Sequence, residues 1–242
     1  MEYLRPYQLP FKEKSWVTTI LFLAIVILIP IVGVMVVLGY RSQLLDRWLK
    51  DGDDQRQKPF DFNNFGDYLQ RGIWPFLYQL LIGLAIGMLA VFIYAAFIAV
   101  AIASNNRAIV FVAFIFYIIS IFALQVIVKF VAWPFTLHGQ ITKGFDLGAA
   151  YRFSKDFYSR IGLVNLIGIS ICVMVLDVLV VLVGMMLLCV GIYAAAALVM
   201  LAENHFLWQL YRKYLAQGGQ PIVVPEPNDS FENPDEPLPQ DI

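Results

Sequence analysis

Four long apolar runs constrain this chain more than any other feature. They cover residues 16–40, 73–103, 108–137 and 161–202, and the charges inside them are Lys129 and Asp177. A helix rises about 1.5 Å per residue, so a hydrocarbon core about 30 Å thick takes about 20 apolar residues per crossing. The first three runs are each long enough for one crossing and the last for two. We therefore expect an all-α, polytopic transmembrane bundle of about four to six membrane helices, some of them broken or re-entrant.

Composition excludes several other classes of protein. Of the 242 residues, 60% are hydrophobic and 14% are charged, whereas an ordinary soluble domain is nearer half apolar. A formal charge of −1 provides no general basic field for nucleic acid. Cys172 and Cys189 lie in the last apolar run without CxxC spacing or histidine partners, so neither a zinc site nor a disulfide framework is expected. We expect no cofactor and no metal.

The first run favours a permanent anchor, since residues 16–40 lack the short apolar segment and cleavage site of a signal peptide. Pro30 removes a backbone donor and Gly33 loosens the helix. The run is therefore either one kinked crossing or two short helices that form a re-entrant hairpin. Residues 1–15, which precede it, form a polar and aromatic segment.

The remaining polar segments lie between and after the apolar runs. Residues 41–72 form the one sizeable loop, which begins as an amphipathic helix ending near Asp51 and continues into an aromatic stretch expected to pack on the membrane surface. Residues 145–160 have the apolar spacing of an interfacial helix. The last run is expected to break within residues 183–191, leaving helices near 161–182 and 191–216.

The final segment, residues 217–242, differs in composition from the helical domain at 16–216. It has six prolines, six acidic residues and no Lys or Arg. Such a segment cannot bury enough apolar area to order itself. We expect an acidic tail that is disordered unless it is bound to something.

The basic residues indicate the orientation in the membrane. If residues 16–40 cross once, the 41–72 loop, residues 138–160 and the C-terminal end share one side with twelve Lys or Arg, against four on the other. If those residues form a hairpin, the ratio is fifteen to one. The richer side is expected to be cytoplasmic. Both alternatives place the loop, the interfacial helix and the C-terminus in the cytoplasm, with the chain in the cell (inner) membrane.

Three charged residues in or near the apolar runs need partners, because a charge at the bilayer centre costs about 2.5–3.5 kcal/mol on insertion scales. Counted along straight crossings, Lys129 and Glu203 lie at similar depth, with His205 nearby. Asp177 lies nearer the outer interface, where water reaches it, and should not pair with Lys129. A Lys129–Glu203 pair is either a polar clasp between helices or part of a proton or ion relay, and we favour the clasp.

Other residues suggest packing and anchoring rather than catalysis. The two histidines, His138 and His205, belong to no catalytic motif. Gly83 and Gly87 form a GxxxG pattern that favours close helix packing, within this chain or against another. The residues expected to anchor the protein at the membrane interface are Trp16, Trp48, Trp133, Trp208, Tyr211 and Arg212.

Several segments, taken in order, resemble one known family. They are Ile29-Pro30-Ile31-Val32-Gly33 with Gly39-Tyr40, Phe62-Asn63-Asn64-Phe65-Gly66-Asp67-Tyr68 with Arg71-Gly72, Leu147-Gly148-Ala149-Ala150-Tyr151-Arg152-Phe153, Leu188-Cys189-Val190-Gly191, and His205 with Gln209-Leu210-Tyr211-Arg212. In these segments the chain resembles the prokaryotic polytopic membrane family catalogued as domain of unknown function 4013. The chain departs from the family at Phe206-Leu207-Trp208, where the family often has a small residue. The resemblance implies a multi-helix membrane fold and no established activity.

The features together favour a non-enzymatic scaffold or accessory subunit of a membrane complex. Aromatic and basic side chains concentrate on one side, and few polar groups lie within the apolar runs. The expected partners are membrane lipids and proteins that dock on the cytoplasmic loop, the interfacial helix or the tail. The alternative is a small permease or lipid-handling protein that uses Lys129, Asp177 and Glu203.

Overall fold

The computed structural model describes residues 1–51, 58–104, 107–186 and 188–223. Throughout this part of the chain the secondary structure is helical, without strands, which confirms the expected all-helical class. The elements are α1 (Arg5–Gln8), η1 (Pro10–Lys12), α2 (Trp16–Ile27), α3 (Val32–Asp51), η2 (Phe62–Asn64), α4 (Phe65–Ser104), α5 (Arg107–Thr142), α6 (Leu147–Ile161), α7 (Leu163–Met186) and α8 (Leu188–Ala216).

Helices α4 and α5 form a long antiparallel hairpin. At 40 and 36 residues they extend about 60 Å and about 54 Å, well beyond the hydrocarbon thickness of a bilayer. Pro75 and Pro134 lie inside the two helices. Both helices therefore continue through their prolines. One proline removes one backbone hydrogen bond, and packing of the surrounding residues outweighs that local cost.

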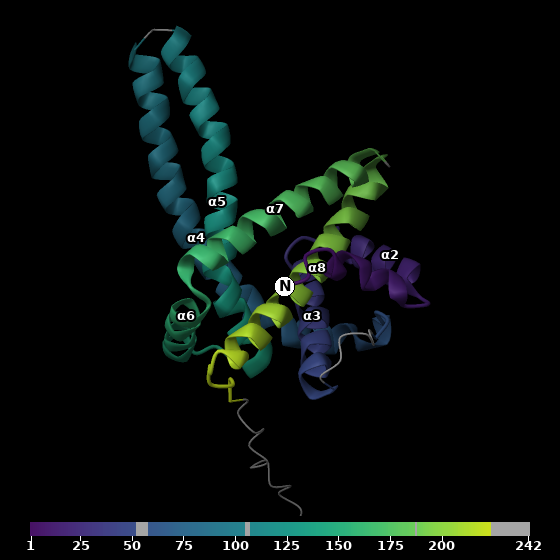
Figure 1. The fold of residues 1–242 in the computed structure, drawn as a ribbon. Coiled ribbons are helices and arrows are strands. Elements are labelled where there is room, and N and C mark those ends of the chain that lie inside the picture. The colour runs from purple at the N-terminus through teal and green to yellow at the C-terminus, as the bar shows by residue number, and fades with distance from the viewer. Residues whose placement is uncertain (52–57, 105–106, 187, 224–242) are drawn as a thin grey trace, which may run out of the picture.

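The hairpin has two zones, which we name the arm (residues 80–103 of α4 and 108–128 of α5) and the base below it. Figure 1 shows the arm standing clear of the other helices. Apolar side chains on its outer surface are exposed, as at Phe92 and Val112, whereas Ala90 is buried and the Phe97 and Phe116 rings stack between the two helices. In the base, Trp133 and Leu137 are buried. The arm spans about 32–36 Å along the helix axes, which matches one hydrocarbon core.

Three helices in the described residues, α4, α5 and α7, are long and apolar enough to cross a membrane. A helix that is apolar all round is either a membrane span or the centre of a large core. The arm has no such core around it within this chain. The structure therefore agrees with an integral membrane protein.

The first apolar run is two helices. It breaks at residues 28–31, where Ile31 adopts a positive φ of 65°. Helix α2 has 12 residues and extends about 18 Å, too short to cross a bilayer. A Cβ on Gly33 would lie 1.9 Å from the carbonyl oxygen of Val26, so only glycine allows α3 to start this close to α2. The structure therefore shows two separate helices in residues 16–40 rather than one kinked helix.

The last apolar run breaks where the sequence predicted. Helix α7 ends at Met186 and α8 begins at Leu188. At their crossing a Cβ on Gly184 would lie 2.7 Å from the carbonyl oxygen of Gly191. Helix α7 runs obliquely to the α4–α5 hairpin (Figure 1). Helix α8 contacts α1, α2, α3, α6 and α7 and so forms the centre of the fold.

The loop, the predicted interfacial helix and the two ends are packed on this body. Helix α3 ends at Asp51 as expected, and α6 forms within the expected segment. In the aromatic stretch Phe60 is buried against Tyr40 and Tyr68, with ring centroids 5.5 and 5.1 Å away, whereas Phe62 is exposed. The expected tail lies mostly outside the described residues, which end at Val223.

Most of the expected interface anchors pack in the core of the protein. Trp48, Trp133, Trp208 and Tyr211 are all buried. Their apolar rings and polar tips suit either a headgroup layer or a packed core, and sequence position alone does not separate the two. Trp16 is half-buried, with its ring 4.8 Å from the ring of Phe11. Arg212 is exposed and lies 4.8 Å from the Trp208 ring.

The GxxxG motif is not a packing site within this chain. A Cβ on Gly83 or Gly87 would meet no atom within 4 Å. The close helix crossing lies instead between α3 and α4. There a Cβ on Gly39 would be 1.6 Å from the carbonyl oxygen of Tyr68, and one on Gly72 would be 1.7 Å from that of Met35.

Candidate functional site: a buried charge cluster

Four charged side chains from four helices meet below the arm, and we name them the charge cluster. They are Arg41 of α3, Lys129 of α5, Asp177 of α7 and Glu203 of α8. The Lys129 ammonium pairs with the carboxylates of both Asp177 and Glu203, and its Nζ lies 2.7 Å from Glu203 Oε1. The Arg41 guanidinium lies 3.8 Å from Glu203 Oε2. Two cations therefore face two anions.

Neutral polar groups surround the cluster. The Tyr7 hydroxyl, from α1, donates to Asp177 Oδ1 at 2.6 Å. Asn204 Nδ2 donates to the backbone oxygen of Arg41 at 2.9 Å, and Gln140 Nε2 donates to Asn204 Oδ1 at 3.3 Å. Every helix except α2, α4 and α6 thus contributes a polar contact, and the N-terminal segment is fastened across the cluster.

The structure corrects the sequence analysis on Asp177. The expectation that Asp177 and Lys129 do not pair is wrong, and so is the placement of Asp177 near outer water, since Asp177 is only 6% exposed. The predicted depth of Asp177 in the membrane assumed that α7 crosses the membrane parallel to the other helices. Because α7 is oblique (Figure 1), its middle passes beside α5 instead of reaching the far side. Lys129 and Glu203 are paired, at the level expected for both.

Sequence reasoning missed Arg41 and Tyr7. Arg41 is the first residue of the segment expected to begin as an amphipathic helix, yet it is 2% exposed. The sequence did contain a signal for this burial, because Arg41 directly follows the apolar run that ends at Tyr40. His205 is also buried, but it packs between the rings of Trp48 and Trp208, with centroids 5.5 and 5.2 Å away. It bonds to Gln209 and is no part of the charge cluster.

Each charge of the cluster depends on its oppositely charged partners to remain buried. A buried charge is tolerated only when it is paired, and removing one partner leaves the other uncompensated. Lys129 lies 22 residues after Arg107, the first residue of α5, and so about 33 Å from the tip of the hairpin. If the arm spans the hydrocarbon core, the cluster lies at the boundary of that core nearer the base, where charges cost less than at the centre.

The cluster is mostly buried, although the side chains of Lys129 and Glu203 keep 19% and 17% of their exposure. Five cavities formed by the described residues have walls that include none of Arg41, Lys129, Asp177 and Glu203. Two of the five lie between α4 and α5 in the arm and have apolar walls. Within the described residues no three His, Cys, Asp or Glu side chains come together as metal ligands. The arrangement can hold helices together.

A second polar contact joins α6 to α8 in the base. The Tyr214 hydroxyl donates to Asp156 Oδ2 at 2.7 Å, and Arg160 Nε donates to the same oxygen at 2.8 Å. Burial, and after it the hydrogen bond to Asp156, together raise the pKa of Tyr214 to about 12. The bond from Tyr214 is also the main cause that lowers the pKa of Asp156 below its ordinary value.

This contact predicts an alkaline loss of stability. The raised folded-state pKa of Tyr214 contributes stability that is complete below the unfolded pKa of about 10 and is lost as pH rises toward about 12. We expect thermal stability of the detergent-solubilised protein to fall across that window, and the fall to be smaller in Tyr214→Phe. Ultraviolet titration of tyrosinate measures the ionisation. An identical decline in both proteins would contradict the assignment.

Comparison with known proteins gives one match. Neither the search of curated proteins nor the search of solved structures finds a match. Residues 22–190 match the family described as "Protein of unknown function (DUF4013)". That segment is more than half of the 242 residues and includes α3, α4, α5, α6 and α7. The resemblance noted in the sequence is thereby confirmed, and the chain belongs to the DUF4013 family.

Proposed function

We propose that the protein is a multi-pass, non-enzymatic scaffold or accessory subunit of a complex in the cytoplasmic membrane. The observation that carries this proposal is the arm of the α4–α5 hairpin. It offers a membrane-length apolar outer surface, while the base forms a separate, well-packed body. Such a surface suits lateral contact with lipids or with the helices of another membrane protein.

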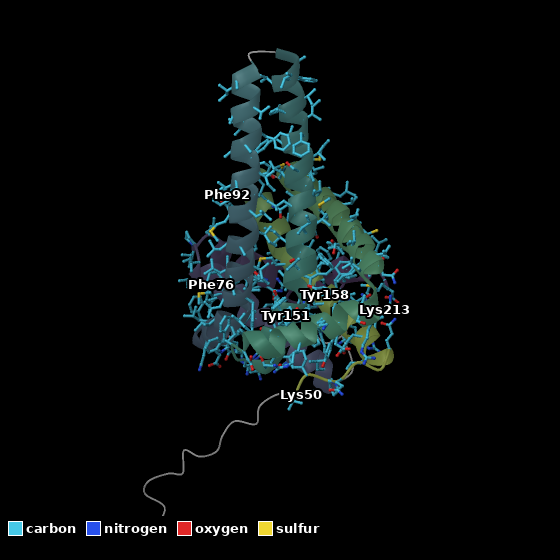
Figure 2. The ribbon with its side chains drawn as sticks, turned by 90° about the vertical axis from the view of Figure 1, so that its left-hand side faces the viewer. Lys50, Phe76, Phe92, Tyr151, Tyr158 and Lys213 are labelled. Atoms are coloured by element: carbon cyan, nitrogen blue, oxygen red, sulfur yellow. The ribbon has the colours of Figure 1, made fainter. Side chains whose placement is uncertain are left out.

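The orientation rests on charge. Figure 2 shows Phe92 on the arm and Lys50, Tyr151 and Lys213 at the opposite end of the molecule. Basic side chains near the ends of membrane spans favour the cytoplasmic side. We place the base, with α6 and the C-terminus, in the cytoplasm. There the exposed side chains of α6, such as Tyr151, are available to a protein partner.

The charge cluster supports a scaffold more than a transporter. A transport site needs a water-accessible cavity or a broken helix that exposes backbone groups to the substrate. The five cavities described above are not lined by any of the four charges, and each charge has an oppositely charged neighbour. A neutral set of ion pairs is suited to fixing α3, α5, α7 and α8 in one arrangement.

The test is position-specific photocrosslinking in native membranes. A photoreactive residue is placed at Phe92 in the arm, at Tyr151 in α6, or at Trp133, which is buried and serves as the control position. We expect a discrete protein adduct from Tyr151 or Phe92 and none from Trp133. Adducts to lipid alone at both exposed positions, together with a monomer after mild-detergent extraction, would contradict the scaffold.

The second candidate is a small permease or lipid-handling protein. The break between α2 and α3 and the charges of Lys129, Asp177 and Glu203 favour it. It predicts solute uptake by proteoliposomes that is lost in Asp177→Asn and kept in Asp156→Asn, whose carboxylate lies outside the cluster. Uptake with that pattern would replace the scaffold proposal.

A further inference from the structure

The base contains a polar cavity that the charge cluster does not use. It has a volume of about 520 Å³ and lies between the C-terminal part of α5, α6 and the end of α8. We name it the α6 cavity. Its wall is formed by His138, Arg152, Phe153, Arg160, Tyr214 and the segment 220–223, with Ala149 and Asp156 completing it. Its size falls within the range of about 300–1,000 Å³ that is common for small-molecule sites.

Of the two arginines at the α6 cavity, one is held in an ion pair and the other is not. Arg160 is engaged, since its Nε donates to Asp156 and its Nη1 donates to the backbone oxygen of Gln217 at 2.9 Å. Arg152 forms no ion pair with any residue the structure describes. Asp146, the carboxylate near it, accepts from the Ala149 N–H at 2.9 Å as the cap of α6.

A buried histidine adds unused hydrogen-bonding capacity to the same wall. His138 is 5% exposed, and its Nδ1 makes no hydrogen bond within the described part of the chain. Buried polar atoms without a partner are rare in native structures and usually indicate a water or a ligand. One histidine and two arginines therefore face a space whose remaining walls include the ring of Phe153 and the side chain of Ile222.

We propose that the α6 cavity binds a phosphate group carried by a small organic molecule. Guanidinium groups present several donors in a fixed plane and match the oxygens of phosphate. Arg152 would be the principal contact, Arg160 would offer its remaining donors, and Phe153 and Ile222 would contact the apolar part of the ligand. The phosphate belongs either to a soluble ester or to a lipid headgroup, because both present anionic phosphate oxygens.

The experiment uses the full chain in dodecyl maltoside, a detergent without phosphate. Binding of glycerol 3-phosphate is measured by calorimetry, and a second arm titrates phosphatidylglycerol, solubilised in the same detergent, by the same method. We expect saturable binding in one arm, which identifies the source, and a loss of about tenfold or more in Arg152→Gln, the effect of one charge-assisted hydrogen bond. Lys155→Gln removes the same charge from an exposed position of α6 outside the cavity wall and should change affinity less than about twofold.

A second variant tests the cavity without altering its arginines. Val223→Asp places a carboxylate at the exposed rim and should weaken binding comparably. Equal losses in Arg152→Gln and Lys155→Gln would overturn the proposal, because they would show general attraction of anions. No saturable binding in either arm would overturn it as well. So would a large gain in affinity in Glu226→Gln/Asp229→Asn, which would identify the chain's own carboxylates as the occupant.

Discussion

Replacing Lys129 with methionine is expected to lower the free energy of unfolding by about 3–5 kcal/mol. Methionine keeps most of the side-chain volume and removes the charge, so Asp177 and Glu203 lose the ammonium that both of them contact. Two carboxylates would then share a buried site with Arg41 as the remaining cation of the cluster. Equilibrium unfolding in mixed micelles, followed by helical circular dichroism, measures the change.

Two further proteins make this result specific to the charge cluster. Lys155→Met removes an exposed charge from α6 and should change stability by no more than about 0.5 kcal/mol. The double variant Lys129→Met/Asp177→Asn leaves Arg41 facing Glu203 and should recover a large part of the loss, with a coupling energy of about 0.5–3 kcal/mol. Losses that simply add, or a loss below about 1 kcal/mol in Lys129→Met, would show that the charges are not interdependent.

Replacing Gly39 with alanine is expected to destabilise the protein by about 3 kcal/mol, at the upper end of the cost of overpacking a core. The added Cβ would lie 1.6 Å from the carbonyl oxygen of Tyr68. That oxygen is backbone, so the clash is relieved only if α3 and α4 move apart. The same unfolding assay measures the effect, and Gly72→Ala, on the opposite side of the crossing, should behave alike.

Gly87→Ala is the matched control, because a Cβ at Gly87 meets no atom within 4 Å. Alanine is the better helix former, so this variant should be neutral or more stable by up to about 1 kcal/mol. If Gly87→Ala were instead the damaging substitution, the GxxxG motif would be the important contact, through another chain. A harmless Gly39→Ala would contradict the close crossing of α3 and α4.

The arm and the base place their apolar side chains in different surroundings. In the arm, apolar side chains face outward and match the thickness of a bilayer. In the base, aromatic rings pack together, as Phe153, Phe157 and Tyr214 do with centroids 5.4–5.6 Å apart. The charge cluster lies between the two regions, where α3, α5, α7 and α8 meet. A change in one of its charges would therefore affect how the arm is held on the base.

Local signals in the sequence predicted the elements of the fold well. Apolar runs of sufficient length indicated the membrane helices, Pro30 and Gly33 indicated the break that separates α2 from α3, and the glycines near residue 184 indicated the turn between α7 and α8. Each of these signals depends only on a few neighbouring residues, either on their backbone geometry or on the transfer of their apolar side chains from water to lipid. Proline inside a helix was the exception, since Pro134 does not end α5.

The sequence by itself thus determined that the chain is helical and where its membrane-length helices lie, because length and apolarity are properties of single segments. Only the tertiary structure decided which residues meet. The oblique course of α7 brings Asp177 to Lys129, the N-terminal segment brings Tyr7 to Asp177, and Gly39, rather than Gly87, lies at the close crossing. Depth, burial and pairing depend on how helices cross, and crossing is set by side-chain packing across the whole body.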